Sequence, residues 1–233
     1  MENLSQLLLK AHTTRTQVAS SGASAPKDIA EVYRIHEAVY AGLANGARPV
    51  AWKVGGPSDK VEPSIAPILP GRVFASPTTV RAADFHIIGV EAEIAFQYTH
   101  NNWELRVALE LCDARLSDWK TAAPLAKLAD NQMNWGLVLG TGTARWERID
   151  FSAQPAELWI GGSKRVELKG GHPYGNPFRL IEWTGTHLAA RGAGFREGDV
   201  ITTGSWGGMH FASAGDEVIA RFPGLGEAVA RIS

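Results

Sequence analysis

The chain has 233 residues, of which 45% are hydrophobic and 20% charged, and its formal net charge is -1. This composition is typical of a globular protein with a full core, and the near-neutral charge argues against general binding to nucleic acid or to a membrane surface. The single cysteine, Cys112, excludes an internal disulfide and a cysteine-based zinc cluster, and we interpret it as a small buried residue.

Two amphipathic helices are predicted in the first part of the chain. Residues 3–18 place leucines on one side, and a second helix begins near Pro26 and stops at Asn45-Gly46. The short run Leu7–Leu9 lacks the length of a signal-peptide core, and no apolar run approaches the roughly 20 residues of a membrane span. We therefore expect a cytoplasmic protein with an N-terminal helical segment, 1–47, and a catalytic domain, 48–233.

Short strands dominate the rest of the chain. We predict strands over 49–54, 88–98, 105–116, 135–140, 199–203, 215–222 and 227–232, and a hairpin of 157–160 with 164–168 around Gly161-Gly162. Residues 59–83 are rich in proline and predict a long functional loop with short strands near Val73 and Val80. Helices are predicted over 122–130 and 176–192. The fold class is therefore α+β, with a β-rich core and peripheral helices.

Three glutamates are the strongest chemical signal in the sequence. Alternation along Val90–Phe96 puts Glu91 and Glu93 on the same face of a strand, roughly 7 Å apart. Glu110 lies in a second strand-like run. Carboxylates held this close require a cation or water between them, and an oxygen-only site suits Mg²⁺ or Mn²⁺. A solvated strand face is the alternative interpretation of the Glu91/Glu93 pair alone.

Seven short motifs in the same order resemble the hydratase/decarboxylase branch of the fumarylacetoacetate hydrolase superfamily, which includes 2-hydroxypenta-2,4-dienoate hydratase and 4-oxalocrotonate decarboxylase. The motifs are Trp52–Gly55, Glu91–Ala95, Ala108–Glu110, Ala129–Asn131, Gly171–Pro173, Gly198–Val200 and Thr203–Ser205. The resemblance implies a mixed β-roll like the fumarylacetoacetate hydrolase C-terminal domain, a Mg²⁺ or Mn²⁺ ion, and homo-oligomers. A related hydratase or decarboxylase is a further expected partner.

The resemblance also assigns roles to residues. It maps the metal ligands onto Glu91, Glu93 and Glu110 and makes Lys53 a catalytic cation that binds or protonates a small 2-oxo acid. A buried lysine beside a metal would have a lowered pKa, whereas an ion pair with a glutamate is the alternative role of Lys53. Substrate-binding candidates complete the set: Thr203, Gly204, Ser205 and Asn131.

The chain departs from the family pattern at Ser64. Relatives carry an acidic residue thought to transfer protons at this place, within a stretch that matches Pro63–Ala66 here. The segment between Glu93 and Glu110 is also shorter than in relatives and lacks a helix. Without the acid, water is harder to activate, so decarboxylation is favoured over hydration as the expected reaction. A weakened subunit that pairs with an active relative is a third possibility.

Further candidates have structural alternatives. His210, after Gly207–Met209, is an acid/base candidate at the pocket mouth or a surface-loop residue, and His172 is better explained by a turn. Asp130 and Asn131 are either indirect supports of the site or helix-end residues. Acylpyruvate-type hydrolases are expected to use a His–Glu pair on an N-terminal loop, and Ser20–Ser24 contains neither residue. The expected function is therefore a metal-dependent hydratase or decarboxylase of a 2-oxo-4-enoate in aromatic catabolism, with carbon–carbon bond hydrolysis as the alternative.

Overall fold

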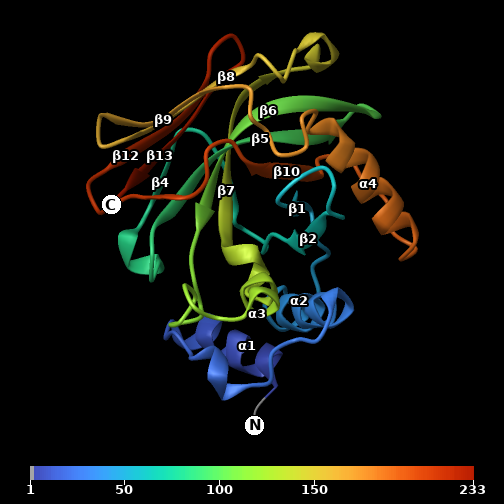
Figure 1. Cartoon of the computed structure of the whole chain (residues 1–233), viewed down its shortest axis with the longest axis vertical. Helices are drawn as coiled ribbons and strands as arrows, with labels where there is room; N and C mark the ends of the chain where they lie inside the picture. The colour runs from blue at the N-terminus through green and yellow to red at the C-terminus, as the bar shows by residue number, and fades with distance from the viewer. Residues whose placement is uncertain (1–2) are drawn as a thin grey trace.

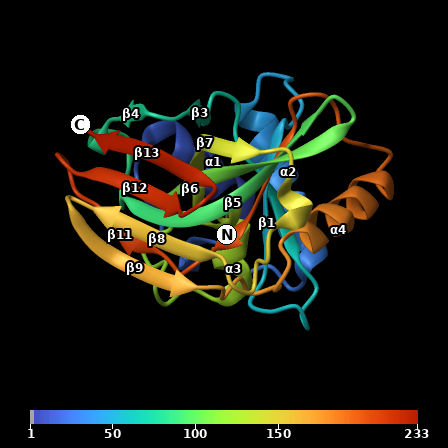
Figure 2. The same ribbon diagram turned by 90° about the horizontal axis from the view of Figure 1, so that it is seen from above.

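Two β-sheets pack face to face, and three of the four α-helices found in residues 3–233 gather at one end of the molecule (Figures 1 and 2). This computed structural model describes residues 3–233, so the first two residues of the predicted 1–47 segment lie outside the described residues. Among these described residues, no helix combines the length and the apolar character that crossing a membrane requires.

The larger sheet has eight strands in the order β2-β1-β10-β5-β6-β7-β3, with β11 paired to β5. It is mixed, because β1/β10 and β3/β7 are parallel and the other pairs are antiparallel. The strands are β1 (Ala51–Gly55), β2 (Ser64–Pro67), β3 (Val73–Ala75), β5 (Gly89–Thr99), β6 (Asn102–Cys112), β7 (Asn134–Thr143), β10 (Val200–Ser205) and β11 (His210–Phe211).

The smaller sheet has five strands in the order β4-β13-β12-β8-β9. Its strands are β4 (Thr78–Val80), β8 (Pro155–Ile160), β9 (Ser163–Lys169), β12 (Glu217–Phe222) and β13 (Gly226–Ile232). The main core lies between the two sheets and includes Ile94 and Phe96 of β5 and Phe222 of β12. Since successive side chains alternate, the glutamates of β5 face the other way, towards the helices.

The N-terminal helices α1 (Leu4–Thr14) and α2 (Ile29–Leu43) form a second core with α3 (Pro124–Ala129). Asn3 caps α1 in a capping box with Gln6, and Asp28 caps α2 by accepting from the Glu31 N–H. Helix α4 (Phe178–Ala189) lies at the side of the larger sheet (Figure 1). The helical segment therefore packs against the rest of the chain through α3 and through Leu116, to which Val18 is bridged.

The structure confirms the β-rich α+β class and moves several predicted boundaries. The first helix ends at Thr14 rather than residue 18, because Arg15 is left-handed and Val18 bridges to Leu116. The loop 59–83 contains an unpredicted strand, β2, and β11 was also missed. The expected two-residue hairpin is present, with positive φ at both Gly161 and Gly162. The β5–β6 connection is a tight hairpin without a helix, as expected.

Candidate functional site

The predicted glutamates lie on one face of the β5–β6 ladder. Glu91 pairs directly with Glu110 in the register, and Glu93 is one pleat further along β5. Glu93 and Glu110 are fully buried, and Glu91 is partly exposed towards a cavity. The antiparallel register thus brings together side chains that are separated by 19 positions in the sequence.

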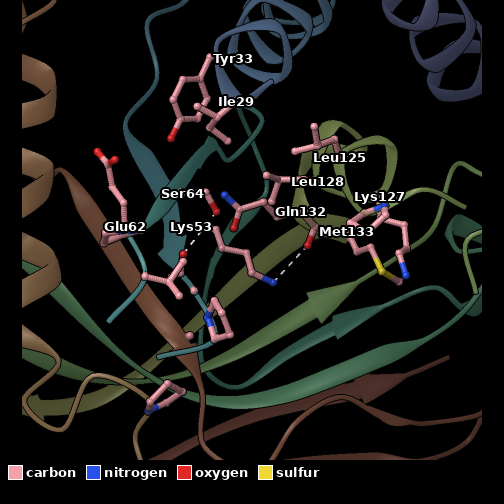
Figure 3. A pocket seen from close by; sticks show the side chains of 18 of the residues that line it. Ile29, Tyr33, Lys53, Glu62, Ser64, Leu125, Lys127, Leu128, Gln132 and Met133 are labelled. Atoms are coloured by element: carbon pink, nitrogen blue, oxygen red, sulfur yellow. Dashed lines mark hydrogen bonds between the residues drawn. The ribbon is translucent and has the colours of Figure 1, made fainter. Parts of the chain in front are cut away.

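Lys53 of β1 is the positive charge nearest to these carboxylates. Its Nζ lies 2.7 Å from Glu110 Oε2 and 3.5 Å from Glu91 Oε2, and it donates to the Gln132 carbonyl at 3.2 Å (Figure 3). Burial alone would lower the pKa of Lys53, but Glu110 and Glu91 outweigh it and raise this pKa well above its ordinary value. The notion of a lowered pKa applies to a lysine beside a bound metal and stays a prediction, whereas in the arrangement described here two close anions stabilise the ammonium.

The carboxylates carry more negative charge than Lys53 can balance. Burial raises the pKa of Glu91 and of Glu110 to about 7 and also raises the pKa of Glu93. Within the described residues, Glu93 Oε1 has no hydrogen-bond partner, and Glu110 Oε2 has only the Lys53 ammonium. Buried, unsatisfied carboxylate oxygens are the donor set that a hard divalent cation needs, so the residues present fit the expected Mg²⁺ or Mn²⁺.

Cys112 of β6, two residues after Glu110, belongs to the same cluster. Ligand atoms of Glu91, Glu110 and Cys112 all lie within 4.8 Å of one another, and Glu93 is not part of this closest group. Burial and the neighbouring carboxylates raise the pKa of the Cys112 thiol. Sulfur is a soft ligand that suits a hard ion poorly, which leaves the three glutamates as the predicted ligands.

Glu93 is fixed by the turn at the end of β10. Its Oε2 accepts hydrogen bonds from the Thr202 hydroxyl and, at 3.1 Å, from the Gly204 N–H. Gly204 has a φ of +96°, a conformation that glycine adopts without the cost other residues incur. The Thr203–Ser205 motif therefore supports the glutamate ladder directly.

A cavity of about 1080 Å³ opens next to Lys53 and Glu91. Its walls come from α2, α3, α4, the segment 55–64 and the turn after β10. Figure 3 shows Tyr33 and Ile29 of α2 on one side and Leu125 and Leu128 of α3 on another. The cavity therefore joins a charged end at the glutamates to a mainly apolar end between the helices, which suits a small acid with a hydrocarbon chain.

Four of the predicted binding or catalytic residues line this cavity: Lys53, Ser64, Gly204 and Ser205. Ser64 donates to the Gly55 carbonyl at 3.3 Å, while Ser205 Oγ is buried without a partner among the described residues. These positions agree with the roles inferred from the resemblance, which stay predictions.

Three predicted residues are not in the cavity lining. Asn131 donates its side chain to the Pro67 carbonyl at 3.1 Å, and Thr203 donates its hydroxyl to the Ile94 carbonyl at 2.6 Å. His210 lies on β11, where its ring is 3.3 Å from the Gly207 carbonyl. Their side chains satisfy backbone groups, so the structure does not support substrate binding by Asn131 and Thr203 or acid/base chemistry by His210.

Sequence reasoning missed other cavity residues. Gln132, Tyr33 and Glu62 all line the cavity. Glu62 is an acidic group two residues before Ser64, but its side chain is exposed, and in Figure 3 its carboxylate points away from Lys53. The neighbouring motif Ala129–Asn131 was the only sequence signal that could have drawn attention to Gln132. His172, judged a turn residue, is buried, and its Nε2 lies 2.9 Å from the Thr203 carbonyl.

Comparison with known proteins gives one family and consistent structural neighbours. The model of the fumarylacetoacetate hydrolase C-terminal domain matches residues 105–233. A 2-hydroxyhexa-2,4-dienoate hydratase of Comamonas testosteroni is 28% identical over 117 residues. This alignment covers 50% of the chain and 44% of the hydratase, so it spans less than half of that relative.

Solved structures extend the similarity to the whole fold. The 4-oxalocrotonate decarboxylase from Pseudomonas putida G7, complexed with magnesium and adipate, has a TM-score of 0.83 at 19% identity, covering 99% of this chain and 96% of the other. A 5-carboxymethyl-2-hydroxymuconate delta-isomerase from Mycobacterium smegmatis has a TM-score of 0.57 at 17% identity, covering 82% and 79% of the two chains. At these identities the likeness establishes a shared fold, including the N-terminal helices in the first case.

Proposed function

Because the chain belongs to the fumarylacetoacetate hydrolase family, we propose that it is a divalent-metal-dependent lyase acting on a small 2-oxo-4-enoate. The observation that carries the proposal is the buried group of Glu91, Glu93 and Glu110 beside Lys53, open to one cavity. The hydratase and the magnesium-bound decarboxylase among its relatives support this class of substrate and ion. Mg²⁺ is the proposed ion and Mn²⁺ the alternative.

The three glutamates would hold the cation, which when bound polarises the 2-oxo group and stabilises an enolate. Lys53, whose Nζ lies 2.7 Å from Glu110 and 3.5 Å from Glu91, would serve as a proton donor or as a cation for the substrate carboxylate. Hydration and decarboxylation both require protonation of the enolate carbon, and Lys53 Nζ is the proposed source. The apolar walls of α2 and α3 would cover the hydrocarbon part of the substrate and limit water there.

Hydration and decarboxylation differ in their need for a base. Ser64 offers a hydroxyl where relatives are expected to carry an acid, and Glu62 points away from Lys53 (Figure 3). Loss of CO₂ requires no activated water, so these positions favour decarboxylation as the primary activity. If the chain is inert alone, the Ser64 replacement instead supports a weakened subunit that works with a related hydratase or decarboxylase.

The direct test is substrate consumption by the purified protein. With Mg²⁺, we expect loss of the absorbance of 4-oxalocrotonate or 2-hydroxypenta-2,4-dienoate, with CO₂ released from the first. Glu110→Gln should abolish turnover, whereas Glu167→Gln, an exposed glutamate of β9, should leave it unchanged. Turnover of neither substrate, with metal shown to be bound, would contradict the lyase; pyruvate plus a carboxylic acid without CO₂ would indicate the hydrolase instead.

We also propose that the chain works as a cytoplasmic homo-oligomer. The family resemblance and exposed apolar side chains such as Phe211 and Val61 support this assembly. Light scattering after gel filtration should give a mass that is a multiple of one chain, and a monomer at micromolar concentration would contradict it.

A further inference from the structure

The loop Asn131–Met133 has an unusual backbone next to the charged end of the cavity. Its three residues have φ of +50°, +52° and +61°, and none of them is glycine. Left-handed backbone at non-glycine residues costs free energy and persists only where the surrounding structure imposes it. Three such residues in succession at a cavity wall therefore require contacts that hold them in this conformation, and they suggest that the loop has a functional role.

Buried contacts impose this conformation. Arg115 pairs with Asp130 at 2.6 Å and donates to the carbonyls of Asp130 and Asn134, so one guanidinium binds the backbone at both ends of the loop. Asn131 is tied to the Pro67 carbonyl of β2 at 3.1 Å, and the Met133 carbonyl accepts from the Asp113 N–H at 2.9 Å. The loop is thus fixed on each side of Gln132, whose side-chain Nε2 has no hydrogen-bond partner among the described residues.

Gln132 presents two different groups to the site. Its backbone carbonyl accepts from Lys53 Nζ at 3.2 Å. Its side-chain Nε2 is buried and has no acceptor among the described residues. In Figure 3 the side chain reaches over the cavity in the direction of Ser64. A buried amide donor without an acceptor is costly, and this one lies in the wall of the proposed substrate cavity.

We propose that Gln132 is a substrate-binding residue, whose side-chain amide donates to a carboxylate oxygen of the bound 2-oxo acid. The left-handed loop positions it, and the same residue orients Lys53 through its backbone. A carboxylate is the ligand group that fits, because the Ser205 hydroxyl in the same cavity wall is a second buried donor without a partner among the described residues, and the Lys53 ammonium adds a positive charge nearby. This inference rests on the proposed function, since it places the substrate acid beside the glutamate-bound cation.

Oxalate, a mimic of a 2-oxo acid, tests the proposal by calorimetry in the presence of Mg²⁺. Gln132→Met keeps the length and the backbone carbonyl but removes the donor, and we expect oxalate to bind about tenfold more weakly. Gln132→Gly removes the same donor while relieving the backbone, so its melting temperature should not fall although oxalate binding weakens. Gln97→Met, outside the cavity on β5, is the matched control and should bind like the wild type.

Kinetics give a second readout. Removal of a contact that is equally strong in the bound substrate and the transition state raises KM and leaves kcat nearly unchanged. Wild-type affinity for oxalate in both Gln132 variants would overturn the proposal, because a loop with only a structural role predicts that result. Failure of the wild type itself to bind oxalate with Mg²⁺ would instead overturn the proposed function, so the two failures are distinguishable.

Discussion

At the scale of single residues, the electrostatics of the glutamate ladder determine when it can accept a cation. Glu91 and Glu110 have pKa values of about 7, mainly because burial disfavours their charged forms. Metal ligation requires the deprotonated carboxylate, so protons and cations compete for the same oxygens. The charged forms are lost as pH falls through about 7, which is the window in which metal binding should change.

We expect the Mg²⁺ affinity to be nearly constant above about pH 8 and to fall by about tenfold per pH unit for each proton displaced below pH 7. Calorimetry at several pH values, in buffers of different ionisation enthalpy, measures both the affinity and the protons released. Glu91→Gln removes one of the titrating groups and should reduce the slope. An affinity that does not vary between about pH 6 and 8 would contradict the role of these carboxylates.

The same raised pKa values make the metal-free fold more stable at low pH, whereas they make metal binding weaker there. A carboxyl whose pKa is higher in the folded state stabilises the fold at low pH, and this contribution is lost as pH rises from about 4.5 to 7. Burial lowers the pKa of His172 to about 4. Its contribution to the stability of the fold is therefore present above pH 6.5 and is lost as pH falls towards 4. Stabilisation by Mg²⁺, measured as the melting temperature with Mg²⁺ minus that with chelator, should therefore be larger at about pH 8 than at pH 6. An equal or larger Mg²⁺ effect at pH 6 would contradict this prediction.

At the scale of secondary-structure elements, the buried Arg115–Asp130 pair joins the end of β6 to the end of α3. Both side chains are 2% exposed, and the pair holds the loop that carries Gln132. Removal of one partner leaves an uncompensated charge in the core, which typically costs about 3–5 kcal/mol. The pair therefore couples the stability of the loop to the geometry of the site.

Asp130→Asn should lower the free energy of unfolding by about 3 kcal/mol or more, measured by urea denaturation. Glu217→Gln, in an exposed ion pair with Arg231 at 2.9 Å on the smaller sheet, should cost about 0–1 kcal/mol. Equal losses in the two variants would mean that Arg115 finds another partner or water when Asp130 is neutral.

Local sequence pattern was sufficient for the elements that carry their own signal. The alternation of Val90–Phe96 correctly predicted β5 and the face of its glutamates, and Gly161-Gly162 predicted a hairpin. Strand β2 was missed because Pro63 before it and Pro67 at its end argue against a strand, which forms here by pairing with β1. The left-handed conformation of Gln132 could not be predicted from the local sequence, because it is imposed by contacts of the loop with Arg115 and Pro67, which are distant in sequence.

At the scale of the whole molecule, the predicted division into 1–47 and 48–233 does not coincide with a division of the core. Leu8 and Val32 of the N-terminal helices share one buried cluster with Leu116 and Ala126 of the larger part. The His36 ring lies 2.8 Å from the Leu128 carbonyl, and Ser20 donates to the Asp118 carboxylate. Helix α2 also supplies Tyr33 to the cavity wall. The N-terminal segment is therefore part of the same packing unit as the site.

This shared core predicts that the described chain unfolds in one cooperative step. Far-ultraviolet circular dichroism reports mainly on the helices, and tryptophan fluorescence reports on residues such as Trp206 in the sheet core. The two signals should change at the same urea concentration, because separate midpoints require separately stable units.

Removal of residues 1–47 should expose the apolar surface around Leu116 and Ala126 and give an aggregating chain without oxalate binding. Two separate transitions, or a truncated chain that stays folded and binds oxalate with Mg²⁺, would show that the segment is an independent domain.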